Sequence, residues 1–83
     1  MRSWLKTLRV ARGLTLKDVG TKLGISESYY CSIEAGTRQQ NMDIMLAAGI
    51  ASIFEIPVAE VIGYDRAWRE EQKSEPGSVA GKK

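Results

Sequence analysis

The stretch GTKLGISESYYCSIE, residues 20–34, ends one helical pattern and begins another within a few residues. Val19 and Leu23 share a helical face and are followed by Gly24, which suits the left-handed position after a helix. Ser26 then has the side chain of a helix N-cap. A turn this short fixes the second helix across the first and leaves its polar N-terminal tip protruding. The stretch therefore predicts a helix-turn-helix.

Helical patterns also flank this stretch, and no segment has the alternation typical of a strand. Gly13 and Thr15 separate the first two helices, Asn41 is suited to cap a fourth, and Pro57 fits the first turn of a fifth. The expected helices cover residues 2–12, 16–23 and 27–35, a segment after Asn41, and a segment from about Pro57 to Gly63. The expected fold class is therefore all-α, with five helices.

The length of 83 residues suits one domain with one core. We expect this domain to cover residues 1–63. Residues 64–73 are expected to form a helical extension that serves as a dimer segment. Residues 74–83 are polar and rich in Gly, Ser and Pro, and we expect a disordered tail there.

The composition excludes several classes of protein. The chain has no histidine and a single cysteine, Cys31, so metal sites of the usual type and an internal disulfide are not expected. The longest apolar run, residues 44–51, is too short to cross a bilayer, and the N-terminal residues lack an apolar signal core. Neither a carboxylate pair on an apolar cleft nor a phosphate-binding glycine loop is evident. We therefore expect a cytoplasmic protein that is not an enzyme and needs no cofactor, with no metal or membrane partner.

The net charge of +2 is unevenly distributed. Six Lys or Arg residues against one Asp give residues 1–24 a charge of +5, whereas one Arg against five Asp or Glu gives residues 25–63 a charge of −4. A basic end on a nearly neutral domain indicates a polyanionic partner. The alternative is that these cations form an ordinary solvated face.

Residues 2–63 resemble the Xre or lambdoid-phage repressor (Cro and C1) family of helix-turn-helix domains. The resemblance rests on LKTLRVARGLTLKDVGTKLGIS, SYYCSIEAGTR and IASIFEIPVAEVIG, in that order. It implies a five-helix repressor-like fold. It also implies binding of double-stranded operator DNA by a homodimer, usually a transcriptional repressor. A controller protein of a restriction-modification system, an antitoxin and a protein-interaction module remain alternatives.

The resemblance also implies which residues read bases. Glu27, Ser28 and Ser32 occupy the positions at which the family contacts base edges, and Cys31 lies beside Ser32 on the same helix tip. Glu27 suits acceptance of a hydrogen bond from cytosine, but an acidic residue is also favoured at a helix N-terminus for its charge alone. Two alternatives to base reading remain for Cys31: it is a small surface or boundary residue, or it is a redox switch.

Contacts to the DNA backbone are implied at Thr37 and Arg38, after the third helix. Leu16 stands where the family often has glutamine, so the phosphate contact there would fall to Thr15 or Lys17. Tyr29 is expected to be exposed near the DNA backbone, with plain surface packing as the alternative.

Two further sets of residues concern the assembly of the domain. Arg9 and Glu34 match an arginine and a glutamate that pair between the first and third helices of the family, so we expect a structural ion pair. Tyr30 replaces an aliphatic residue of the family, and its hydroxyl is expected to reach water at the edge of the core. The dimer interface is expected to involve the last helix and its extension, at Val61, Ile62, Tyr64 and Trp68, although part of this set must pack on the first and fourth helices. The alternative for Trp68 is that its segment folds back on its own domain.

Overall fold

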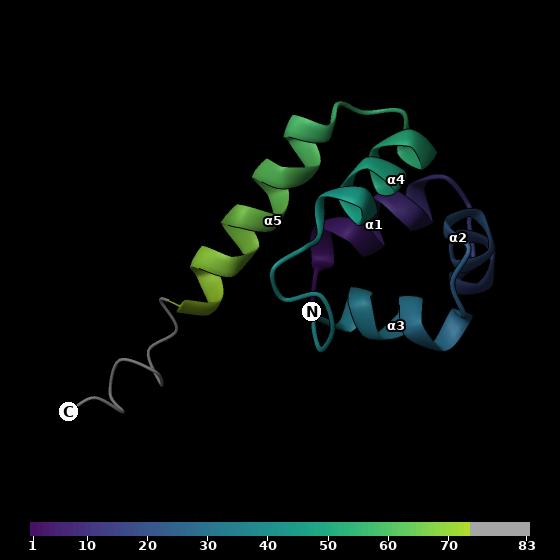
Figure 1. The fold of residues 1–83 in the computed structure, drawn as a ribbon, viewed down its shortest axis with the longest axis horizontal. Coiled ribbons are helices and arrows are strands. Elements are labelled where there is room, and N and C mark those ends of the chain that lie inside the picture. Colours follow the sequence, from purple (N-terminus) through teal and green to yellow (C-terminus); the bar gives the residue numbers. More distant parts are fainter. Residues whose placement is uncertain (74–83) are drawn as a thin grey trace.

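The computed structural model describes residues 1–73, which form five α-helices and no strand within that range (Figure 1). The expected all-α fold class is therefore confirmed. Residues 74–83, where we expected a disordered tail, lie outside the described residues. The helices are α1 (Ser3–Ala11), α2 (Leu16–Leu23), α3 (Glu27–Ala35), α4 (Ile44–Phe54) and α5 (Val58–Lys73).

Local side-chain bonds determine where α2 and α3 begin. Thr15 Oγ1 accepts from the Asp18 amide over 3.0 Å, and Asp18 Oδ2 accepts from the Thr15 amide over 2.8 Å, which completes a capping box. The Ser26 hydroxyl accepts from the Tyr29 amide over 3.0 Å. Gly24 ends α2 with a φ of 75°, in the left-handed region that favours glycine. The two helices therefore begin and end where the sequence predicts.

The core lies between the first four helices and the first half of α5. α2 packs on α3 and α4, α1 packs on α3, and α4 packs on α5. Gly20 permits the close approach of α2 to the turn, because a Cβ atom there would lie 3.1 Å from the Ile25 carbonyl oxygen. The core residues are apolar apart from one tyrosine hydroxyl: Leu5, Val19, Tyr30, Ile33, Ala47, Ile50, Ala51, Phe54 and Val61.

The start of α4 differs from the expectation. Its N-cap is Asp43, whose Oδ1 accepts from the Met45 amide over 2.8 Å, and not Asn41. The Asn41 side chain instead accepts from Arg69 Nη1 over 3.2 Å. The expectation was wrong because a partner on α5, distant in sequence, uses the side-chain oxygen that would otherwise have capped the helix.

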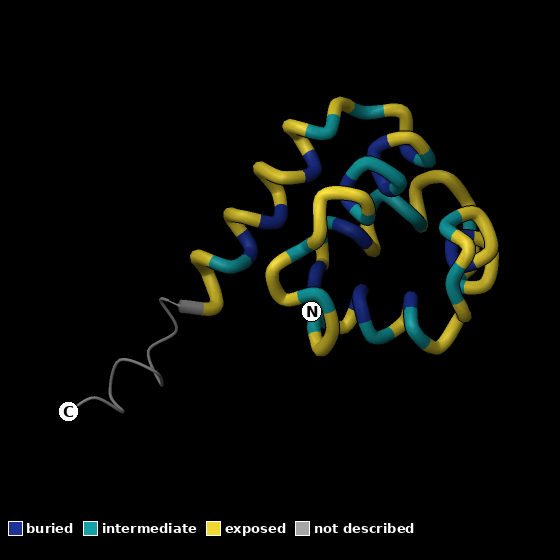
Figure 2. Tube along the Cα trace, viewed as in Figure 1, coloured by how far each residue is buried: buried dark blue, intermediate teal, exposed yellow. Residues whose placement is uncertain are grey.

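α5 differs from the expectation in its extent. The helix continues through Gly63 to Lys73, so the expected boundary at residue 63 coincides with no helix end. Figure 2 shows buried positions recurring along α5, between exposed ones. They are Val61, Asp65 and Trp68, at the spacing of one helical face. Residues 64–73 thus continue the same helix and contribute to the same folded body.

Within residues 1–73, no single helix is long and apolar enough to span a membrane. α4 and α5 pass that test only when taken together, and they are bent by 114° relative to each other.

Candidate nucleic-acid interface

The N-terminal half of α3 presents a small polar surface. Glu27, Ser28 and Cys31 are exposed and Ser32 is partly exposed. Residues three and four apart on a helix are neighbours, so these four side chains form one continuous surface, which we call the α3 tip. The Ser32 hydroxyl donates to the Ser28 carbonyl oxygen over 3.2 Å, which leaves its oxygen as an acceptor. The structure thus brings together the four residues expected to read bases.

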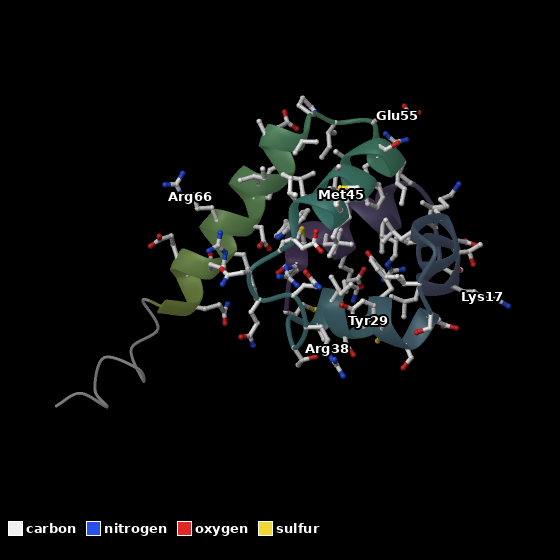
Figure 3. All side chains as sticks on the ribbon, in the orientation of Figure 1. Lys17, Tyr29, Arg38, Met45, Glu55 and Arg66 are labelled. Carbon is white, nitrogen blue, oxygen red and sulfur yellow. The ribbon has the colours of Figure 1, made fainter. Side chains whose placement is uncertain are left out.

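Cationic side chains flank the α3 tip. Figure 3 shows Lys17 extending outward from α2 and Arg38 from the loop after α3. Both are exposed, as is Lys22 near the end of α2. Thr15 lies at the start of α2, where its hydroxyl oxygen already serves the capping box. The arrangement places positive charge on both sides of a short polar helix surface, as a phosphate backbone on either side of a groove would require.

The basic surplus of residues 1–24 is smaller at the surface than the sequence indicated. Arg2 is completely buried against Asp65, and the Arg9 side chain is only 12% exposed beside Glu34. These two cations are neutralised within the fold, so they do not belong to the surface that faces a polyanion.

The loop after α3 is folded back on that helix. The Thr37 amide and hydroxyl donate to the Ser32 carbonyl oxygen over 3.0 and 3.2 Å, and the Arg38 amide donates to the same oxygen over 3.3 Å. The Arg38 guanidinium carbon lies 5.9 Å from the centre of the Tyr29 ring. These contacts fix the backbone from which Arg38 extends.

Tyr29 is not the freely exposed side chain that we expected. It is half-buried and packs against the core, and its hydroxyl accepts from Gln39 Nε2 over 3.0 Å. The alternative of surface packing describes Tyr29 better, because the loop after α3 returns across this side chain. Tyr29 therefore supports the loop, and its hydroxyl is directed toward the protein.

Glu34 is the centre of a buried polar cluster. Its two carboxylate oxygens accept from Arg9 Nε and Nη2 over 2.8 and 3.1 Å, which joins α1 to α3 as the resemblance implied. The Tyr30 hydroxyl also donates to Glu34, over 2.9 Å. The hydrogen bond to Glu34 raises the pKa of Arg9 despite its partial burial. Burial, with the nearby Glu34 charge, raises the pKa of Tyr30 well above its usual value.

The Tyr30 hydroxyl therefore does not reach water, contrary to the expectation. Tyr30 is 0% exposed, and a buried hydroxyl requires a partner, which Glu34 supplies from the next turn of the same helix.

The residues expected at a dimer interface divide into two groups. Ile62 and Tyr64 are 43% and 41% exposed. The centre of the Tyr64 ring lies 5.6 Å from the centre of the Trp4 ring. Val61 is 0% exposed and Trp68 is 9% exposed, so both belong to the interior of this chain. The expectation that these two residues lie at a dimer interface was wrong, and for Trp68 the alternative of folding back on its own domain holds, because this face of α5 packs against α4 and the loop after α3.

The sequence interpretation missed Arg2, which it counted as one cation among several. The signal was on α5: Asp65 shares a helical face with Val61 and Trp68, and a carboxylate on an apolar face needs a cationic partner. Among residues 1–73, no three His, Cys, Asp or Glu side chains are placed to hold a metal ion.

Comparisons with known proteins agree with this geometry. A helix-turn-helix family model matches residues 5–61, which confirms the resemblance to the Xre and lambdoid-phage repressor family. A protein from Bacillus subtilis (strain 168), named as the uncharacterized HTH-type transcriptional regulator YqaF, is 37% identical over 49 residues. Those residues are 59% of this chain and 64% of that protein, so the match spans less than two thirds of the relative. No solved structure matches significantly. Because the family model covers most of the described helices, the chain belongs to the helix-turn-helix family.

Proposed function

We propose that the chain is a DNA-binding transcription regulator, a dimeric repressor that reads a palindromic operator through α3. The observation that carries this proposal is the exposed polar α3 tip, flanked by Lys17 and Arg38. The helix-turn-helix family and the name of the Bacillus subtilis relative support the same function.

In the proposed complex, the α3 tip enters the major groove. Ser28 and Ser32 are short enough to let the helix backbone approach the bases, and their hydroxyl groups donate to or accept from several base edges. Glu27 accepts from the exocyclic amine of cytosine. A carboxylate near phosphates is repelled, so Glu27 contributes mainly by rejecting bases that offer no donor.

Lys17 and Arg38 contact phosphates and set the register of the domain on the duplex. Such contacts carry no sequence information of their own. Their loss should therefore weaken binding to all sequences alike and reduce its dependence on salt.

Two copies are needed because one recognition helix covers too few base pairs to find a site among genomic competitors. A two-fold dimer places the two α3 helices about 34–36 Å apart, one turn of the duplex. Ile62 and Tyr64 are the predicted interface residues that stay exposed in the single chain.

The decisive experiment is a selection of bound sequences from random duplex DNA. Wild-type protein should enrich a palindrome, and Ser32→Ala and Glu27→Gln should each change the preferred half-site. Ser52→Ala, an exposed serine on α4 outside the α3 tip, is the matched control and should keep the wild-type preference. Recovery of no common sequence would refute specific DNA binding and favour the protein-interaction alternative.

The dimer is tested separately by sedimentation with and without the selected DNA. Ile62→Lys should weaken association, because it places a charge on the proposed apolar contact. Val10→Lys is the control, since Val10 is a similarly exposed apolar residue on α1, at 57%. A wild-type protein that stays monomeric and binds isolated half-sites independently would contradict the dimer.

A further inference from the structure

Arg2 lies between α5 and the end of α3, and its guanidinium is 0% exposed. Its Nε donates to Asp65 Oδ1 over 2.6 Å, which connects residues 63 positions apart. A buried guanidinium is costly unless its donors are used, so the remaining N–H groups show what this residue holds.

The other donors of Arg2 are directed at main-chain carbonyls. Nη1 donates to the Ile33 oxygen over 2.6 Å and to the Arg38 oxygen over 3.1 Å, and Nη2 donates to the Gln39 oxygen. The Arg2 amide donates to the Glu34 oxygen over 2.8 Å. These carbonyls belong to the last turn of α3 and to the loop that carries Arg38.

Arg2 supplies a charge that α3 lacks. The last turn of α3 contains no basic residue, although the carbonyl end of a helix favours a cation. The Arg2 guanidinium lies at that end and comes from outside the helix, ahead of α1. Unlike a lysine or arginine within the helix, it binds the helix end and the following loop together.

The loop needs such support because its conformation is strained. Gln39 has a φ of 56°, in the left-handed region that is unfavourable for residues other than glycine. Its side chain donates to Tyr29 and accepts from the Asp43 amide over 3.1 Å, while its carbonyl accepts from Arg2. Bonds from three separate parts of the chain hold this one residue in place.

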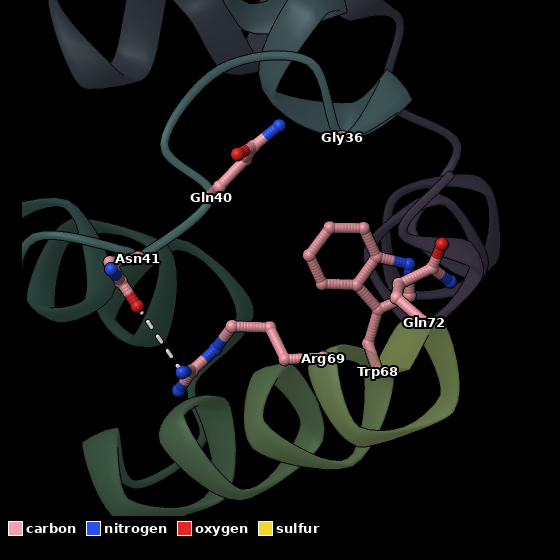
Figure 4. Close-up of a pocket in the computed structure, with 6 residues that line it drawn as sticks. All are labelled: Gly36, Gln40, Asn41, Trp68, Arg69 and Gln72. Carbon is pink, nitrogen blue, oxygen red and sulfur yellow. Dashed lines mark hydrogen bonds between the residues drawn. The ribbon is translucent and has the colours of Figure 1, made fainter. Parts of the chain in front are cut away.

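α5 supports the other side of Arg2 and the loop. The Trp68 ring lies under the guanidinium, with 4.6 Å from its centre to the Arg2 Cζ atom. Trp68 also faces Gly36, where an added Cβ would lie 2.8 Å from Cζ2. A cleft of about 490 Å³ lies between α5 and the loop. Figure 4 shows the Arg69–Asn41 bond among the residues that line it. The loop is therefore tied to α5 on both sides of this cleft.

We propose that Arg2 is a positioning residue for DNA binding: it fixes the loop that carries Thr37 and Arg38, and through Asp65 it ties that loop to α5. The effect on DNA rests on the proposed function, whereas the fixing of the loop does not. Because Arg2 is fully buried, it contacts no phosphate itself and acts only through the loop.

The first test uses hydrogen exchange in the free protein, which needs no DNA. Arg2→Met should speed exchange of the Thr37 and Arg38 amides about tenfold or more. The Ile33, Arg38 and Gln39 carbonyls lose their bonds to a charged donor, so the loop around these amides opens more often. Arg12→Met is the matched control. Like Arg2→Met, it removes one guanidinium charge, and it also removes a bond to a main-chain oxygen. That bond runs from Arg12 to the Phe54 oxygen over 2.7 Å, at the end of α4 and away from the loop after α3. Arg12→Met should leave both amides at the wild-type rate.

The second test measures affinity for the selected DNA as a function of salt. Arg2→Met should reduce the slope of log K against log salt by about one per half-site, the change expected for loss of the Arg38 contact. Arg38→Ala should do the same, and the double variant should reduce the slope no further. If Arg2 acted independently of Arg38, the losses in binding free energy of the two single variants would add in the double variant.

The outcomes separate the two proposals. Faster exchange in Arg2→Met, with a wild type that selects no DNA, supports the loop anchor and refutes the proposed function. A folded Arg2→Met with unchanged exchange and unchanged slope overturns the inference. If Arg2→Met does not fold, Asp65→Asn replaces it. It removes the negative charge that faces both Arg2 and Arg69, whose Nε lies 3.6 Å from Asp65 Oδ2. Unchanged exchange at Thr37 and Arg38 in that variant overturns the inference equally.

Discussion

Arg9→Met removes the guanidinium that faces the buried Glu34 carboxylate. In the wild type, Arg9 donates twice to Glu34 and the Tyr30 hydroxyl donates once. Glu34 is 3% exposed, so water cannot replace the lost donors. The variant therefore leaves a buried negative charge that is held by a single neutral hydroxyl.

The size of the effect follows from this burial. Removing one partner of a buried ion pair costs about 3–5 kcal/mol. The Arg9 side chain keeps some solvent access, at 12% exposure, which favours the lower value of about 3 kcal/mol. In a domain of this size, 1 kcal/mol corresponds to about 4–8 °C in Tm. The Tm of Arg9→Met should therefore fall by about 12–24 °C.

Two further variants separate charge burial from lost packing. Tyr30→Phe removes one donor but leaves the ion pair, so its free energy of unfolding should fall by only about 1.5 kcal/mol. The triple variant Arg9→Met/Tyr30→Phe/Glu34→Leu leaves no polar group behind and should recover much of the loss, because an apolar replacement of a buried pair is often neutral.

The assay is thermal unfolding followed by far-ultraviolet circular dichroism, with Lys6→Met as the control at an exposed position of α1. An Arg9→Met protein with the same Tm as the Lys6→Met control would refute the reasoning. A triple variant less stable than Arg9→Met would show that packing, and not an unpaired charge, determines the loss.

Two glycines and one aspartate give further predictions. Gly36→Ala should destabilise by about 1–2 kcal/mol or more, since Gly36 has a φ of 88° and Trp68 occupies the space of a Cβ. Gly63→Ala should stabilise by about 0.5–1 kcal/mol, because nothing lies within 4 Å of a Cβ there. Chemical denaturation measures the free energy of unfolding of both variants. Changes of the same sign in the two variants would contradict the prediction. The hydrogen bonds from Thr15 lower the pKa of Asp18. The stability that they add is complete above the ordinary carboxyl pKa, about 4, and is lost as the pH falls through the lowered value. Asp18→Asn should therefore flatten the acid side of the Tm profile, and an unchanged profile would speak against it.

The sequence by itself determined the elements that depend on neighbours within one or two turns. The capping box of Thr15 and Asp18, the left-handed Gly24 and the Ser26 cap involve residues at most three apart, so their patterns are complete in the sequence. The four residues of the α3 tip follow from helical spacing once α3 is located. The Arg9–Glu34 pair came from the family resemblance, because no local pattern joins residues 25 positions apart.

The tertiary structure decided which polar side chains are buried and where α5 leads. Arg2 and Asp65 are 63 residues apart, and each looks like a surface charge until α5 folds against the end of α3. The same packing buries Val61 and Trp68 and brings Arg69 within hydrogen-bond distance of the Asn41 side chain. The fold of the loop after α3 separately brings Gln39 to the Tyr29 hydroxyl. A helical pattern specifies an apolar face, but the partner of that face depends on the angles between helices. Those angles result from the packing of all the helices together, and no short stretch of sequence contains them.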